Sequence, residues 1–497
     1  MTSPGLVLRA RKLRAARGVT VATDVSLTAA PGEVIAVHGP NGSGKTTLLA
    51  AAAGLLPDGH DTLRPGPVGY APERASQLPR VPVSGWLASL GRTAGLSREE
   101  SASRTGDLLR RLGLDPYAAR TMNALSRGNT QRALVAQALI ADPDLVILDE
   151  PAGGLDDDGV RRVAAEIIRA ARRDAVVLVA THPAAPVPLP PGTTWRFADG
   201  KVRAEPRAGT RLGAGFEVET GDGRLHRVSE EALPGLLRAA LDAGLPIRRV
   251  QPGSELTPAA APLPRTNAER GQTRAVRRQG AGSRLLYGAL HRAWLLAAAQ
   301  WFAAPMLLFL AVLALVYATD AGSAPLQPDG FVAITLIPVV TWLTIQAHRV
   351  DGRELGRAFA VHIGGRSRAH LAADVAVLPY GVALSVVAVV WALASQGEHP
   401  HPPLVILRMT ALLVAAAVSG IGLGSALALI ERMGWRLIVA VAAFLVLVLG
   451  RYTPLTPLLK LATSATTAST VGTQCGLMVL AGVALAAAAA VLASRLS

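Results

Sequence analysis

The sequence predicts two folds on one chain, an α/β domain followed by an all-α domain of membrane-spanning helices. Two observations predict this division. Residues 1–293 contain 67 Asp, Glu, Lys and Arg, whereas residues 294–497 contain only 18. Short apolar runs suited to buried strands occur in the first part, and runs of about 20 apolar residues, long enough to cross a bilayer, occur in the second. The division excludes a uniformly soluble enzyme and a protein that is membrane-embedded throughout.

The charge of the chain fits a membrane protein with a cytoplasmic part. The 497 residues carry a formal net charge of +15. Next to apolar spans, such an excess is more typical of contact with the cytoplasmic leaflet than of nucleic-acid binding, so no nucleic-acid partner is expected. Cys475 is the single cysteine, which excludes an intrachain disulfide. Residues 1–18 are rich in arginine and lack an apolar core, unlike a secretory signal. The N-terminal half is therefore expected in the cytoplasm.

A short apolar strand, Val34–Val37, leads into a glycine-rich loop and an expected helix, Leu48–Gly54. The loop consists of Gly39, Pro40, Asn41, Gly42, Ser43, Gly44, Lys45, Thr46 and Thr47. This is the G-x-x-x-x-G-K-[ST] pattern of a phosphate-binding P-loop. Its amides can wrap around phosphates, Lys45 can reach the β and γ phosphates, and the Thr46 hydroxyl can ligate Mg²⁺. The sequence therefore predicts a P-loop domain that binds a nucleoside triphosphate and Mg²⁺.

A second apolar strand, Leu145–Glu150, ends in two acids. A continuous apolar strand suits the centre of a parallel sheet, where its C-terminal end would lie beside the phosphate loop. Asp149 could hold Mg²⁺ directly or through water. Glu150 could orient and deprotonate the water that attacks the γ-phosphate. Taken alone, the pattern also fits a buried strand followed by a capping acid.

Two further elements complete the N-terminal pattern. Ser126 and Gly128 precede an expected apolar helix, Ala133–Ile140, where they could grip a phosphate or simply cap the helix. The apolar strand Val176–Ala180 is followed closely by His182, which could hydrogen-bond a γ-phosphate or have a structural role.

The order of these motifs resembles the nucleotide-binding domain of ATP-binding cassette (ABC) transporters over roughly residues 5–205. In the resemblance, Gly39–Thr47 corresponds to Walker A, Leu145–Glu150 to Walker B, Leu125–Gln131 to the family signature, Leu155-Asp156 to the D-loop, and His182 to the switch histidine. The resemblance implies that the signature serine of one subunit closes on nucleotide bound by the other. It also implies catalytic roles for Lys45, Glu150 and His182.

Three departures from the family pattern are present. The signature has Arg127 and Asn129 where Gly and Gln are commoner. Glu73 stands at the position of the Q-loop glutamine, where its carboxylate could still bind the metal or water. No Phe, Tyr or Trp precedes Walker A, so the aromatic that usually stacks on adenine is missing. Either Arg14 or Arg17 stacks there, or base selectivity is loose.

Six runs in the second half are expected to be membrane helices, because helices satisfy their own backbone groups in lipid. They cover 294–317, 329–347, 371–394, 408–430, 436–450 and 471–494. Small residues in Ser419–Gly424 would let helices approach closely. Arginines concentrate in 348–370 and 431–436, whereas 318–328 and 395–403 have no Lys or Arg. By the positive-inside rule, the arginine-rich loops and both termini face the cytoplasm. His399 and His401, in an outward loop, have a metal-compatible spacing but fit a solvated loop better.

Between the two halves the sequence predicts an accessory subdomain and a linker. Residues 206–256 combine β-like runs at Phe216–Glu219 and Ile247–Val250 with an amphipathic helix, Ser229–Ala243. Residues 257–283 are rich in Pro, Ala, Gly and Arg, typical of a flexible basic linker beside anionic lipid. An interfacial helix over 283–300 could lead into the first span. The predicted domains are 1–205 for the ATPase, 206–256, 257–283, and 284–497 for a six-helix permease domain.

The cytoplasmic loop 348–370 is charged and partly amphipathic, which suits an element that docks on the ATPase domain. A solvated loop whose arginines only fix the topology is the alternative. This loop, and the order of ATPase before permease, are similar to fused half-transporters of the type-2 ABC exporters. Because six spans are half of a usual transporter, we expect a second copy of the chain (a homodimer) or a related half-transporter as partner.

The resemblance implies ATP-driven export, at a multi-pass position in the cytoplasmic membrane. The apolar spans suit a hydrophobic or amphipathic substrate, such as a lipid, a peptide or a small molecule, in contact with membrane lipids. An importer is an alternative, although the loop 348–370 has no convincing importer-type docking motif. A non-transporting ATPase for signalling or mechanical force is another, although its outward loops would be short.

Overall fold

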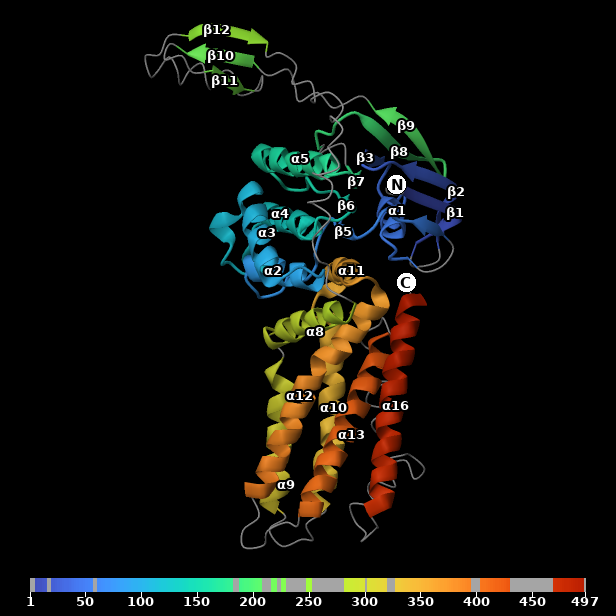
Figure 1. Cartoon of the computed structure of the whole chain (residues 1–497), viewed down its shortest axis with the longest axis vertical. Helices are drawn as coiled ribbons and strands as arrows, with labels where there is room; N and C mark the ends of the chain where they lie inside the picture. The colour runs from blue at the N-terminus through green and yellow to red at the C-terminus, as the bar shows by residue number, and fades with distance from the viewer. Residues whose placement is uncertain are drawn as a thin grey trace.

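The computed structural model describes residues 5–15, 19–56, 60–181, 187–207, 216–220, 225–228, 247–252, 281–299, 302–319, 327–394, 403–429 and 468–495. An α/β domain stands at one end of a bundle of long helices (Figure 1). Helices α8 (Ala281–Ala297) and α11 (Gly352–Ile363) lie between these two parts. The two predicted kinds of fold are both present.

A six-stranded sheet in the order β5-β6-β7-β3-β8-β9 forms the centre of the α/β domain. The first five strands run parallel, and β9 is antiparallel to β8. Every residue of β6 and β7 is buried, as expected for strands covered on both faces. The strands are β3 (Val34–His38), β5 (Val68–Ala71), β6 (Leu145–Asp149), β7 (Val176–Ala180), β8 (Gly192–Ala198) and β9 (Lys201–Arg207).

Two helices of this domain begin earlier than the sequence predicted. Helix α1 starts at Lys45 instead of Leu48, because the left-handed Gly44 ends the loop directly before it. Helix α4 starts at Arg127 instead of Ala133, because the Ser126 hydroxyl caps it by accepting from the Asn129 amide over 3.3 Å. The helices are α1 (Lys45–Ala52), α2 (Val83–Thr93), α3 (Arg98–Arg111), the short turns η1 (Asp115–Tyr117) and η2 (Met122–Ala124), α4 (Arg127–Leu139) and α5 (Asp157–Arg172).

Two smaller antiparallel sheets accompany the central one. The order β2-β1-β4 joins strands β1 (Leu6–Arg14), β2 (Thr20–Ala29) and β4 (Asp61–Leu63). The order β11-β10-β12 joins β10 (Phe216–Thr220), β11 (Leu225–Val228) and β12 (Ile247–Pro252). Strands β10 and β12 fall on the two β-like runs of the expected accessory subdomain. The helix expected over Ser229–Ala243 lies outside the described residues.

Among the described residues, five long helices form the bundle, α9 (Ala303–Thr319), α10 (Gln327–Arg349), α12 (Arg366–Ala394), α13 (Pro403–Ala428) and α16 (Ala468–Arg495). Within the described part of the chain, three stretches are long and apolar enough to cross a membrane, Arg366–Ala394, Ile406–Ala428 and Cys475–Ala493. A shorter apolar helix covers Ala303–Leu315. The predicted first span is divided, because α8 ends before α9 begins. The expected span 436–450 lies outside the described residues, so the six-span domain stays a prediction.

Glycines bring α13 into backbone contact with its neighbours, as the small residues of Ser419–Gly424 predicted. A Cβ atom at Gly420 would come 2.8 Å from the Ile337 carbonyl oxygen of α10. One at Gly422 would come 2.3 Å from the Gly482 carbonyl oxygen of α16. Helix α13 therefore packs against α10 and α16 at distances that only glycine permits.

We expect Gly422→Ala to destabilise the bundle by about 1–3 kcal/mol, because the added methyl group forces two backbones apart. Gly476→Ala is the matched control, since a Cβ there meets nothing within 4 Å and alanine favours the helix. The thermal unfolding midpoints of the purified, detergent-solubilised variants measure the difference. Equal midpoints for the two variants would contradict this account of the packing.

Candidate functional site

The phosphate loop connects β3 to α1, as the sequence predicted. Gly42 and Gly44 have φ of 78° and 107°, a left-handed conformation that glycine adopts without steric cost. Lys45 is only 7% exposed. Its Nζ donates to the carbonyl oxygens of Gly39 over 2.9 Å and Pro40 over 3.2 Å. The loop thus has a turned conformation, in which the Lys45 ammonium group is hydrogen-bonded to the loop's own backbone.

Thr46 and Asp149 are 103 residues apart in sequence, and the fold brings the hydroxyl of one to the carboxylate of the other. Thr46 Oγ1 donates to Asp149 Oδ2 over 2.8 Å. Burial raises the pKa of Asp149 to about 6, with smaller contributions from the charges of Glu73 and Glu150, while the Thr46 hydrogen bond opposes the rise. Mg²⁺ prefers oxygen ligands of these two kinds beside phosphates. The donor set therefore fits this ion.

Glu150 follows Asp149 in an unusual backbone conformation. Its φ is 49°, in the left-handed region that is sparsely occupied by residues other than glycine and recurs at functional sites. Its carbonyl oxygen accepts from Gln131 Nε2 over 3.3 Å and from the Gly153 amide over 3.2 Å. Its own amide donates to the Ala180 carbonyl oxygen over 3.1 Å. Three hydrogen bonds thus fix the backbone of the residue that is predicted to be the general base.

The signature segment lies against the D-loop segment. A Cβ at Gly128 would meet the Gly154 carbonyl oxygen at 2.9 Å, so the two backbones are in contact. Asp156 caps α5 by accepting from the Gly159 amide over 2.8 Å. Ser126, at the start of α4, is exposed. This residue therefore lies at the surface of the chain.

For two predicted site residues the described part of the chain shows no contact with the phosphate loop. His182 lies outside the described residues. Glu73 forms an exposed ion pair with Arg74 over 3.0 Å. It acts on Asp149 through its charge. The proposed roles of His182 and Glu73 stay predictions.

A cavity of about 400 Å³ opens beside the first residues of the phosphate loop. It is lined by His38, Gly39, Pro40, Asn41, Thr181, Arg196 and Phe197. Burial lowers the pKa of His38, and the charges of Arg196, Arg207 and Lys45 lower it further. Arg196 and Phe197 were not predicted to lie here, because β8 joins the site only through its pairing with β3.

Helix α11 carries the main polar contacts between the α/β domain and the long helices. Glu354 accepts from the Ser76 hydroxyl over 2.7 Å and from its amide over 3.3 Å. Burial opposes ionisation of Glu354, but these hydrogen bonds leave its pKa lowered. His362 Nε2 lies 2.8 Å from the carbonyl oxygen of Gln137, on α4. The predicted docking loop is therefore largely a helix, which contacts both the segment after β5 and the signature helix.

Apolar side chains extend this contact into a single core. Leu355, Phe359 and Ile363 of α11 are at most 1% exposed and pack with the core of the α/β domain. On α8, the ring of His291 stacks on Phe359 with centroids 5.3 Å apart, and its Nδ1 pairs with the Ser89 hydroxyl of α2. Burial lowers the pKa of His291 to about 3, with smaller contributions from Arg292 and His362, so the ring is neutral.

Comparisons with known proteins match the N-terminal α/β domain of the chain. Residues 22–153 match the family model described as ABC transporter. The chain is 40% identical over 142 residues to the zinc import ATP-binding protein ZnuC of Cereibacter sphaeroides, covering 28% of this chain and 56% of that protein. It is 35% identical over 181 residues to the ABC transporter ATP-binding protein NatA of Bacillus subtilis, covering 33% of this chain and 72% of that protein.

A third relative is the lipoprotein-releasing system ATP-binding protein LolD of Hyphomonas neptunium. The identity is 34% over 188 residues, which cover 34% of this chain and 82% of that protein. The chain spans little more than half the length of the first curated relatives that it matches, 56%, 51% and 57%. Because the matches nevertheless span most of NatA and LolD, the chain belongs to the ABC transporter family, and its N-terminal domain is an ATP-hydrolysing ABC ATPase.

Proposed function

We propose that this chain is a half-transporter that uses ATP hydrolysis to export a hydrophobic or amphipathic substrate across the cytoplasmic membrane. The observation that carries the proposal is the position of α11. This helix lies between α10 and α12 in sequence, and its side chains are built into the ATPase core. A movement of the ATPase domain would therefore reach membrane helices of the same chain directly.

The ATPase residues have complementary proposed roles. The amides of the phosphate loop and Lys45 bind and neutralise the β and γ phosphates. Thr46 and Asp149 would hold Mg²⁺, which would supply positive charge to the phosphate oxygens. Glu150 accepts the proton of the attacking water, and its fixed backbone keeps the carboxylate at the end of β6. His182, which follows β7 closely, would donate a hydrogen bond to the γ-phosphate.

The exposed position of Ser126, in the signature segment, favours a homodimer with two composite ATP sites. Ser126 and Gly128 of one copy would close on nucleotide bound by the phosphate loop of the other. Closure would move α4, which carries Ser126 at its start and Gln137 near its end. Because the Gln137 carbonyl oxygen bonds His362 of α11, α4 would transmit the closure to the membrane helices. A related half-transporter could replace the second copy.

Import is the second candidate, because some relatives are named as import proteins for zinc and for Fe(3+) ions. Comparing the compounds that accumulate in cells with and without this chain would identify a substrate for the test. Uptake into inverted vesicles would then indicate export, and uptake only into right-side-out vesicles would indicate import. ATP turnover without flux would favour a non-transporting ATPase.

We expect Glu150→Gln to reduce MgATP turnover by about 10²–10⁴-fold, because the amide cannot accept the proton of the attacking water. Nucleotide should remain bound after rapid gel filtration. Glu99→Gln, an isosteric change at an exposed position of α3, is the control and should leave both measurements unchanged. An undiminished phosphate release rate in Glu150→Gln would refute the general-base role.

We expect Glu354→Ala to weaken the transmission of ATP binding, because it removes hydrogen bonds to a charged group worth about 1.5–3 kcal/mol. Hydrogen exchange of α12 and α16, with and without ATP in a Glu150→Gln background, measures the transmission. The ATP-dependent change should become smaller in Glu354→Ala. Asp107→Ala, which removes only an exposed ion pair with Arg110, is the control. The same ATP response in both variants would rule out this route.

A further inference from the structure

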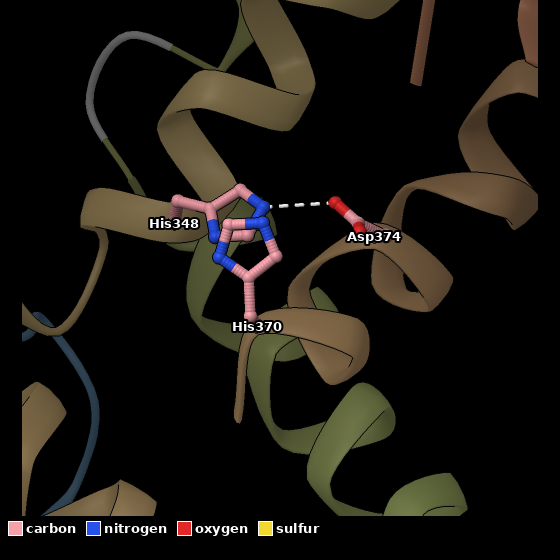
Figure 2. Close-up of side chains that lie close together, drawn as sticks. All are labelled: His348, His370 and Asp374. Atoms are coloured by element: carbon pink, nitrogen blue, oxygen red, sulfur yellow. Dashed lines mark hydrogen bonds and ion pairs between the residues drawn. The ribbon is translucent and has the colours of Figure 1, made fainter. Parts of the chain in front are cut away.

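Three side chains that commonly ligate metals meet at the ATPase-facing end of the bundle. His348 lies in the last turn of α10, and His370 and Asp374 lie one turn apart on α12. Their ligand atoms all lie within 4.8 Å of one another. The two imidazole rings have centroids 4.0 Å apart, and the Asp374 carboxylate points toward His348 (Figure 2). The cluster joins two helices, one on either side of α11 in sequence.

The cluster is buried and held in place by its own hydrogen bonds. The side chains of His348 and Asp374 are 7% and 4% exposed, and His370 is 8% exposed. His348 Nε2 lies 2.8 Å from Asp374 Oδ1. Ser425 of α13 is fully buried and forms hydrogen bonds with Asp374 and His370. Its Oγ donates to Asp374 Oδ2 over 2.9 Å and lies 2.8 Å from His370 Nε2.

A carboxylate among apolar helices needs a compensating positive charge, because burial of an unpaired ion is costly. Arg292, whose charge reaches Asp374, is already paired with Asp351. That ion pair measures 2.8 Å and its two side chains are 5% and 1% exposed. The Arg292 charge is thus largely compensated by Asp351. The Asp374 carboxylate pairs directly with His348, and a bound cation would supply the compensating charge when that ring is neutral.

Two imidazoles and one carboxylate form a ligand set with open positions that is typical of zinc and of non-haem iron sites. Ser425 supplies the outer hydrogen bonds that orient such ligands. Imidazole nitrogen favours transition ions, whereas Mg²⁺ and Ca²⁺ prefer oxygen ligands. Zinc–nitrogen bonds of about 2.0–2.1 Å would draw the three ligand atoms inward by small side-chain rotations.

We propose that His348, His370 and Asp374 bind one divalent transition-metal ion, of the Zn²⁺ class, at the base of α11. The ion bridges α10 to α12 and fixes the spacing of the two helices that hold α11 against the ATPase domain. Binding at this site does not depend on the direction of transport.

The test titrates the untagged full chain in lipid nanodiscs, without nucleotide, with Co²⁺ as a visible-light probe. We expect one Co²⁺ per chain, with the visible absorption of a low-coordinate site, and displacement by Zn²⁺. Asp374→Asn and His370→Asn should each weaken the affinity at least tenfold. The double variant His399→Ala/His401→Ala removes the other closely spaced histidine pair and should bind Co²⁺ as the unaltered chain does.

Ser425→Ala keeps all three ligands and tests the outer hydrogen bonds separately. It should retain one Co²⁺ per chain with affinity about 10–100-fold weaker. The absence of Co²⁺ absorption in the unaltered chain would overturn the proposal, whether or not the ligand variants fold. Unchanged affinity in a folded Asp374→Asn chain, or loss of binding only in the His399/His401 variant, would also overturn it.

Discussion

The buried contact of α11 with the ATPase domain is the interaction on which the rest of the structure depends. Leu355, Phe359 and Ile363 recur every four residues and so lie along one helical face. That face is buried with the core of the α/β domain, while the chain at each end of α11 continues into a long helix. Helix α11 and the α/β domain consequently share a core, and separating them would expose apolar surface to water. A movement of the α/β domain would therefore also move α11 and, through it, the long helices on either side of it in sequence.

The same constraint connects the contact to the catalytic elements. Helix α4 begins directly after the exposed Ser126 and ends close to Gln137. The Gln137 backbone bonds α11, and its side chain accepts from Trp86 Nε1 over 3.2 Å. Between Ser126 and Gln137, Gln131 donates a hydrogen bond to the carbonyl oxygen of Glu150. One helix thus contacts the proposed dimer interface, the proposed general base and the coupling contact. Its rigidity is what would make ATP binding and membrane motion parts of one event.

Local patterns predicted the elements that are local in sequence. The sequence alone predicted the phosphate loop, the buried strand that ends at Asp149 and the close-packing glycines of α13. These features could be predicted because each depends on residues that are adjacent in sequence. Helix α11 was expected only as a charged docking loop, although its four-residue apolar spacing was the available signal. The partners of Arg196 and of His348 depend on sheet pairing and helix packing between distant segments, which no single stretch of sequence reveals.

A disulfide cross-link between Gln77 and Gly352 tests the docking of α11 most directly, because a Cβ at Gly352 would lie 3.2 Å from Gln77 Cβ, close to the disulfide range. Replacing both by cysteine in a Cys475→Ser chain leaves no other thiol. Pairing position 77 with Gly365, where an added Cβ would meet nothing within 4 Å, is the control. After oxidation in lipid, we predict linked peptides by mass spectrometry for the 77–352 pair alone. No link, or an equal link in the control, would contradict the account.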